Sequence, residues 1–142
     1  MRKSIYPILI LAAIMATSCT QNGVQSAPQP LTEKQSALLA KTLAGRVAGK
    51  PVSCISSFPS TGFTRVSNSI LLYGNSGSVV YQNTLPYGCG GTLRDDDILV
   101  FEPFGSKHCE GDTIKLVDRY SGIIGGVCRL GAFVPYKRTS GG

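Results

Sequence analysis

Residues 69–83 read SILLYGNSGSVVYQN, and this stretch decides the fold class. Two runs rich in β-branched, aliphatic and aromatic residues, 69–73 and 78–83, flank the four-residue turn 74–77, Gly-Asn-Ser-Gly. Runs of this kind joined by a short Gly/Asn turn are typical of a β-hairpin. The sequence therefore predicts an antiparallel pair of strands near the middle of the chain.

Five more stretches of the same character, separated by turns, indicate further strands. They are Val52 to Ile55, Ile98 to Glu102, Thr113 to Asp118, Gly126 to Arg129 and Ala132 to Tyr136. Short strands at this spacing favour a small antiparallel β-sheet closing toward a barrel or sandwich. The predicted fold class is mainly β (α+β), with an N-terminal helix that covers one face or one open end of the sheet.

That helix is predicted within residues 32–50. Thr32 is a favourable N-cap, and Gln35 three positions later completes a capping box. The Gly-Lys-Pro run at 49–51 is a stop signal. Between them, apolar residues recur every four positions and are expected to share one face, at Leu39, Leu43 and Val47.

The 142 residues have a formal net charge of +6; 15% of them are charged and 42% are hydrophobic. This length suits a single domain, and the composition excludes broad disorder. The only histidine, His108, excludes any metal site built from several imidazoles. No cofactor is predicted.

The N-terminus has the pattern of an export signal. Arg2 and Lys3 precede the apolar run 5–16, which is too short to span a membrane as a helix, because about 20 residues are needed. Residues 15–19, Met-Ala-Thr-Ser-Cys, resemble the lipobox of bacterial lipoproteins, in which the cysteine is lipidated and becomes the first residue. Residues 1–18 are therefore the predicted signal peptide and Cys19 the predicted lipidation site. The alternative is ordinary cleavage and a soluble periplasmic or secreted protein.

The number of cysteines favours lipidation of Cys19. The chain has five cysteines, an odd number, and lipidation of Cys19 leaves four that can pair. Thr20 follows the cysteine where an aspartate would retain a lipoprotein in the inner membrane, so the resemblance implies the outer membrane, facing the periplasm. Membrane contact through this anchor is the first predicted partner interaction.

The mature chain divides into three predicted parts. Residues 19–31 are the lipidated cysteine and a flexible tether, whose average span is roughly 18 Å. Residues 32–138 are the helix and the disulfide-bonded β-domain, and residues 139–142 are a flexible tail. Residues 31–50 carry four basic side chains against one acidic side chain, which we interpret as a solvated face with contact to anionic lipid as the alternative.

Cys54, Cys89, Cys109 and Cys128 are predicted to form two disulfides. An exported protein enters an oxidising compartment, and the spacing contains no C-x2-C pair typical of zinc sites. Three pairings are open. We favour Cys54–Cys128 with Cys89–Cys109, which would tie the ends of the domain together and brace its middle.

Two segments concentrate charged side chains, but neither predicts a metal site. Residues 108–112, His-Cys-Glu-Gly-Asp, lack a second soft ligand at a fixed spacing. Residues 95–97 are three adjacent aspartates, whose side chains diverge, whereas calcium loops use alternate positions. A small periplasmic hydrolase using surface carboxylates is the enzymatic alternative, and its candidate residues are Asp95, Asp97, Glu110 and Asp112.

Nucleic acid is not a predicted partner. From residue 51 onward the chain has 8 basic and 7 acidic residues, so the domain has almost no net charge to attract phosphates. Its tyrosines and phenylalanines are expected in the core or in cross-strand pairs. Residues 101–105, Phe-Glu-Pro-Phe-Gly, are the aromatic loop that best suits a binding edge.

Four runs carry a wider resemblance: residues 45–55 (GRVAGKPVSCI), 80–86 (VYQNTLP), 109–112 (CEGD) and 128–136 (CRLGAFVPY). Together they resemble a family of small bacterial envelope proteins and lipoproteins of uncharacterised activity, over about residues 38–138. The resemblance implies an exported, disulfide-bearing domain and brings no catalytic residue.

The predicted function is a lipid-anchored envelope module that binds a partner or serves as a structural element, and that is not an enzyme. A rigid β-domain on a tether suits binding, because its loops are presented at low entropic cost. The partners considered are another envelope protein, a secreted hydrolase that the module inhibits, and a wall glycan.

Overall fold

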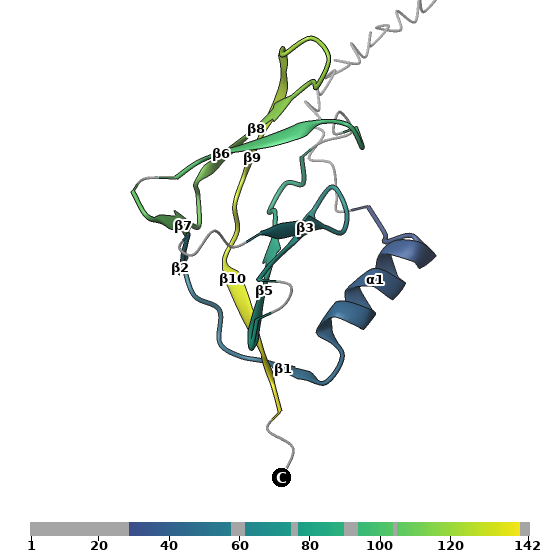
Figure 1. The fold of residues 1–142 in the computed structure, drawn as a ribbon, viewed down its shortest axis with the longest axis vertical. Coiled ribbons are helices and arrows are strands. Elements are labelled where there is room, and N and C mark those ends of the chain that lie inside the picture. The colour runs from purple at the N-terminus through teal and green to yellow at the C-terminus, as the bar shows by residue number, and fades with distance from the viewer. Residues whose placement is uncertain (1–28, 58–61, 75–76, 90–93, 104, 140–142) are drawn as a thin grey trace, which may run out of the picture.

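The computed structural model describes residues 29–57, 62–74, 77–89, 94–103 and 105–139. Within these residues the chain forms one helix followed by strands (Figure 1). The elements are α1 (Glu33–Leu43), β1 (Arg46–Ala48), β2 (Cys54–Ser56), β3 (Phe63–Arg65), β4 (Ile70–Tyr73), β5 (Val79–Thr84), β6 (Ile98–Glu102), β7 (Lys107–Cys109), β8 (Thr113–Val117), β9 (Ile124–Arg129) and β10 (Phe133–Arg138).

The strands form three antiparallel sheets. A five-stranded sheet has the order β1-β10-β5-β4-β3, a three-stranded sheet has the order β6-β8-β9, and β2 pairs with β7. The predicted hairpin is confirmed as β4–β5, in which Tyr73 lies opposite Tyr81 and Leu72 opposite Gln82. The fold is mostly β, as predicted, but the described strands do not close into a barrel.

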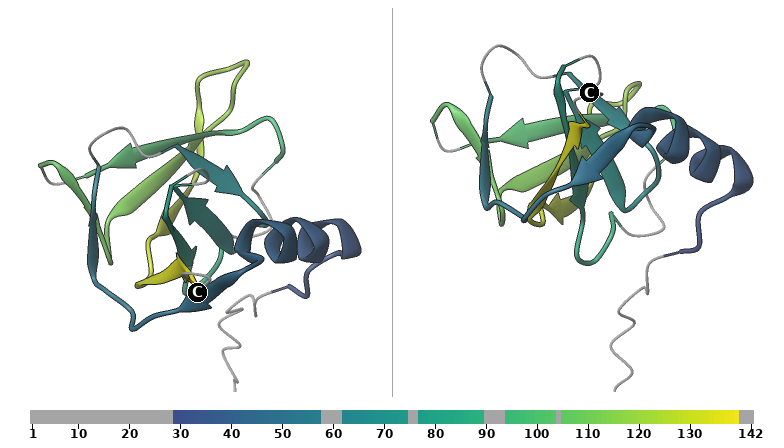
Figure 2. Two further views of the ribbon diagram at one scale, coloured as in Figure 1. Left: turned by 60° about the horizontal axis from the view of Figure 1, so that its bottom comes forward. Right: turned by 90° about the horizontal axis from the view of Figure 1, so that it is seen from below.

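The sheets and the helix stack in a fixed order. Leu71 and Tyr73 of β4 point into a core shared with Ile114 and Leu116 of the three-stranded sheet. The alternate residue Leu72 points to the other face, where Val80, Val66 and the α1 residues Leu39 and Leu43 pack. The order is therefore α1, then the five-stranded sheet, then the three-stranded sheet (Figure 2).

Helix α1 begins at a capping box and ends earlier than predicted. The Gln35 amide donates to Thr32 Oγ1 at 3.3 Å, and the Thr32 amide donates to Gln35 Oε1 at 2.9 Å. The helix stops at Leu43, and Gly45 takes a φ of 67°, which turns the chain into β1. The prediction that Val47 continues the helical face is wrong, because Val47 pairs with Lys137 of β10.

The disulfide pairing also differs from the one favoured above. The bonds are Cys54–Cys109 and Cys89–Cys128, not Cys54–Cys128 with Cys89–Cys109. Cys54 and Cys109 lie directly opposite each other in the β2–β7 pair. Cys128 points inward from β9 and is buried with Cys89 in the main core. Strand β7 was not among the predicted strands, so the neighbour of Cys54 could not be identified from the sequence.

Candidate functional site

The three-stranded sheet carries apolar side chains on both faces. In the middle strand β8, Ile114 and Leu116 are buried in the core, so Lys115 and Val117 face outward. The strand register places the outward residues in three rows across β6, β8 and β9. The rows are Ile98, Val117 and Ile124; then Val100, Lys115 and Val127; then Glu102, Thr113 and Arg129.

We call these rows the outer face; Tyr120 and Ile123 of the β8–β9 turn lie at its end. The apolar residues of the face and of this turn are among the most exposed large hydrophobic residues described: Val127 is 60% exposed, Ile123 67% and Tyr120 84%, and Ile98, Val100 and Ile124 are exposed as well. A tyrosine offers about 150–250 Å², and a buried Val or Ile side chain corresponds to roughly 60–120 Å², so at these exposed fractions the six present on the order of 400 Å² of apolar surface. That area lies within the range for the largest patch on a monomeric protein, and such patches mark interaction sites.

A β-bulge shapes the edge of this face. Leu116 pairs with Gly126 and Val117 pairs with Ile124, so Gly125 has no partner in the ladder. The extra residue lets Ile124 and Val127 point outward although they are three positions apart. A bulge also interrupts the ladder that an added strand would need, so β9 is a poor edge for strand addition. The outer face is therefore suited to contact through its side chains.

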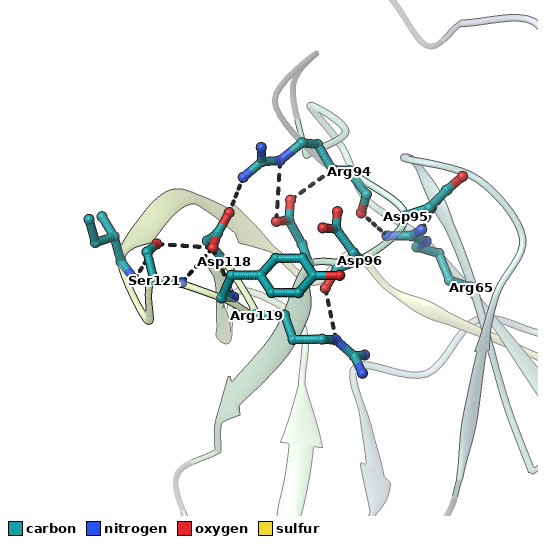
Figure 3. Close-up of polar contacts among 10 residues, drawn as sticks. Arg65, Arg94, Asp95, Asp96, Asp118, Arg119 and Ser121 are labelled. Carbon is teal, nitrogen blue, oxygen red and sulfur yellow. Dashed lines mark hydrogen bonds and ion pairs between the residues drawn. The ribbon is translucent and has the colours of Figure 1, made fainter.

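A charged cluster holds the start of β6 against the turn after β8 (Figure 3). Arg65 Nη2 contacts Asp95 Oδ1 at 2.8 Å, and the Arg65 Nη1 donates to the Arg94 carbonyl at 2.9 Å. The Arg94 amide donates to Asp97 Oδ2 at 2.7 Å, and the Arg94 guanidinium is paired with Asp118. These carboxylates are engaged by arginines that connect three segments of the chain.

Asp118 organises the β8–β9 turn. Its Oδ1 accepts hydrogen bonds from the Ser121 amide at 2.8 Å, from the Ser121 hydroxyl at 3.0 Å and from the Tyr120 amide at 3.0 Å. The hydrogen bonds from Ser121, then that from Tyr120 and the charge of Arg94, hold the pKa of Asp118 below its usual value. The turn that carries Tyr120 and Ile123 is thus fixed from within.

The four carboxylates considered for an enzyme do not come together. Asp95 and Asp97 precede β6, whereas Glu110 and Asp112 lie in the β7–β8 turn, beyond the other end of the β6–β8 pair. Five residues of strand separate the two ends, a distance of about 14 Å. Asp112 Oδ2 accepts a hydrogen bond from the Cys109 amide at 2.7 Å.

A cavity of about 450 Å³ lies at the polar end of the outer face. It is open to solvent and is lined by Glu102, Pro103, Gly111, Asp112, Thr113 and Arg129. Arg129 donates to the Gly111 carbonyl at 3.4 Å, and Lys115 Nζ reaches Glu102 Oε1 at 2.5 Å. Opposite charges therefore stand on the two edge strands of the same sheet.

His108 belongs to an aromatic cluster and not to a group of acids. Its ring centroid lies 5.9 Å from that of Tyr73 and 5.5 Å from that of Phe101. Tyr73 Oη and His108 Nδ1 are buried without a hydrogen-bond partner among the described residues. Burial, with a further effect of the Asp112 charge, raises the pKa of Tyr73 well above its usual value.

Within the described ranges, no three His, Cys, Asp or Glu side chains gather to hold a metal ion. None of the helical structure described is long and apolar enough to cross a membrane. Cys19, and Phe104 of the proposed aromatic loop, lie outside the described residues.

Comparisons of the chain with protein-family models, curated proteins and solved structures found no match. The outer face was not predicted from the sequence. Its signal is the unbroken apolar run 98–101, Ile-Leu-Val-Phe, in a short antiparallel sheet, where one face is usually polar.

Proposed function

We propose that this chain is a lipid-anchored protein of the cell envelope, attached through Cys19, whose domain binds another protein through the outer face. The observation that carries the binding role is the group of six exposed apolar residues, four on a sheet whose opposite face is already buried in the core and two in the adjoining turn. Leaving that surface in water is unfavourable, at about 25 cal/mol for each Å². A partner that covers it removes the cost.

The rigidity of the surface supports a binding role. The inward side of the three-stranded sheet is bonded to the rest of the core through Cys89–Cys128, and the turn at its tip is fixed by Asp118. A surface that is already ordered loses little conformational entropy when it binds.

The order of the layers indicates which kind of partner the outer face can reach. The tether leads into α1, which lies on the side of the five-stranded sheet opposite to the three-stranded sheet. The three-stranded sheet lies on the far side of the five-stranded sheet from the helix (Figure 2), and its outer face points away from that core. With an anchor at Cys19, this arrangement favours a protein partner over the bilayer that holds the lipid.

The test has two readouts. The intact mass of the protein extracted from native membranes reports the modification of its first residue, and an acylated Cys19 is expected. A photo-crosslinking residue is then placed at Val127 in intact cells, with Val47 of β1 as the control, because the two positions are 60% and 59% exposed.

A specific crosslinked product from Val127 and none from Val47 is expected. If the first residue carries no lipid, the proposed membrane anchor is wrong. Equal crosslinking from both positions, or none from either, would remove the binding role.

A further inference from the structure

We propose that the partner of the outer face is a second copy of this chain, packed face to face about a two-fold axis parallel to β8. The inference rests on the proposed function, since it names the partner of the same surface. It follows from the arrangement of the three rows, because this surface is complementary to itself.

A two-fold axis parallel to β8 keeps each residue at its height along the strand and exchanges the two edge strands. The row of Ile98 and Ile124 then meets the same row of the second copy. Ile98 of each copy lies over Ile124 of the other. Val100 meets Val127 in the same way. Apolar residues face apolar residues along the whole of the first row and at the two edge positions of the second row, whose central residue is Lys115. The β8–β9 turns of the two copies lie together at one end.

The third row supplies charge complementarity. Glu102 of β6 and Arg129 of β9 stand at the same height on opposite edges, so the axis brings each Glu102 over the Arg129 of the other copy. Both side chains are exposed. The central Lys115 residues meet near the axis, and each is already paired with its own Glu102. A two-fold axis perpendicular to the strands places the charged row on an apolar row or places like charges together, so the charges favour the axis parallel to β8.

The area suits an interface at the small end of the usual range. A standard interface buries about 800 Å² on each partner, and the apolar residues supply roughly 400 Å² of that, to which the charged row adds. Two sheets pack face to face at about 10 Å, as in β-sandwiches. The bulge at Gly125 disfavours the competing mode, in which two β9 strands would pair along their edges.

Sedimentation equilibrium of the mature chain, residues 19–142, with Cys19→Ser tests the inference, because this form lacks both the apolar signal peptide and the lipid and so needs no detergent. Twice the mass of one chain is expected. Val127→Asp is expected to raise the dissociation constant at least about 30-fold, the effect of losing a central contact. Val47→Asp, at a matched exposure on β1, is expected to leave it unchanged. Melting temperatures verify that each variant is folded.

Variants that reverse the charge of Glu102 or Arg129 test the proposed orientation of the two copies. Glu102→Arg and Arg129→Glu are each expected to weaken the dimer, since each places like charges together. Mixing the two variants is expected to restore it, because every contact between the two rows then joins opposite charges.

A monomer at concentrations up to roughly 100 μM, well above the micromolar limit for interfaces of this size, would overturn the inference. A dimer that Val127→Asp does not weaken would also overturn the inference. If the mixture of the Glu102→Arg and Arg129→Glu variants fails to associate, the proposed axis is wrong. The proposed function fails separately, by an unmodified Cys19 or by the absence of crosslinks at Val127 to any protein.

Discussion

The side chain of Asn83 pairs with the backbone of Gly131, 48 positions away. Asn83 Nδ2 donates to the Gly131 carbonyl at 2.6 Å, and the Gly131 amide donates to Asn83 Oδ1 at 3.0 Å. Asn83 is fully buried, and a Cβ on Gly131 would collide with the Thr84 carbonyl. The amide side chain thus replaces a missing rung of backbone hydrogen bonds where β9 leads into β10.

Asn83→Ala is expected to lower the free energy of unfolding by about 2–4 kcal/mol, because it leaves a donor and an acceptor buried without partners. Urea denaturation measures the change. Gln82→Ala on the same strand is the control, since Gln82 is half-buried and its amide lies on the exposed side. Equal stability of the Asn83 variant and wild type would show that the pair is not needed.

The lowered pKa of Asp118 predicts a pH dependence. In an unfolded chain an aspartate titrates near 3.9, and in the folded protein the Asp118 pKa is lower. Its contribution to stability is therefore complete above about pH 4 and is lost as the pH falls through the folded-state pKa.

Asp118→Ala should melt below wild type at pH 7, with a difference that shrinks under acidic conditions. Thermal melts between pH 2 and pH 7, chosen to bracket the titration of aspartate, measure it. Asp96→Ala is the control, because Asp96 joins the cluster through its main-chain carbonyl. A difference that stays constant down to the lowest pH would contradict the account of the turn.

Tyr73→Phe is expected to keep or raise the melting temperature. The hydroxyl is buried without a partner among the described residues, and burying a lone hydroxyl costs about 1–3 kcal/mol. The phenyl ring keeps the contacts with Phe101 and Phe133, at centroid distances of 6.2 and 5.5 Å. Tyr73→Ala, which removes the ring, should cost about 3–5 kcal/mol. A clear loss of stability in Tyr73→Phe would indicate that the hydroxyl has a bonded neighbour.

The two disulfides are expected to differ in their reactivity toward a small thiol. Cys54 is exposed and Cys109 half-buried, whereas Cys89 and Cys128 are 5% and 3% exposed. Graded reduction in the folded state, followed by alkylation and peptide mass analysis, should label Cys54 and Cys109 first. Loss of either bond is expected to cost about 4 kcal/mol, given sequence separations of 55 and 39 residues. Labelling of all four cysteines at one rate would contradict this order.

Local signals in the sequence located some elements well and others not at all. The hairpin turn at 74–77 and the capping box at Thr32 are patterns of neighbouring residues, so β4, β5 and the start of α1 could be predicted. The strands β1, β3 and β7 have three residues each and depend on distant partners, such as β10 for β1. The end of α1 was misplaced for the same reason, because pairing with β10 takes residues 46–48 out of the helix.

The site was harder to predict than the fold. The carboxylates were visible in the sequence, but their arginine partners come from other segments, as Arg65 does for Asp95. The outer face depends on the register of three strands and on a bulge at Gly125, neither of which is marked by a local motif. Its apolar residues have the sequence pattern of core residues, and only their exposed fractions in the structure show that nothing in the described chain covers them.

The disulfide pairs interleave along the chain, since Cys89 lies between Cys54 and Cys109, and Cys109 lies between Cys89 and Cys128. If the chain is exported from its N-terminus, as proposed, Cys54 emerges before Cys89 and both emerge before Cys109 and Cys128, yet Cys54 and Cys89 are not partners. An oxidant that joins cysteines in order of emergence would trap the wrong bond. Native pairing therefore requires oxidation to wait until β7 has emerged beside β2, or a thiol–disulfide isomerase to correct the first bond.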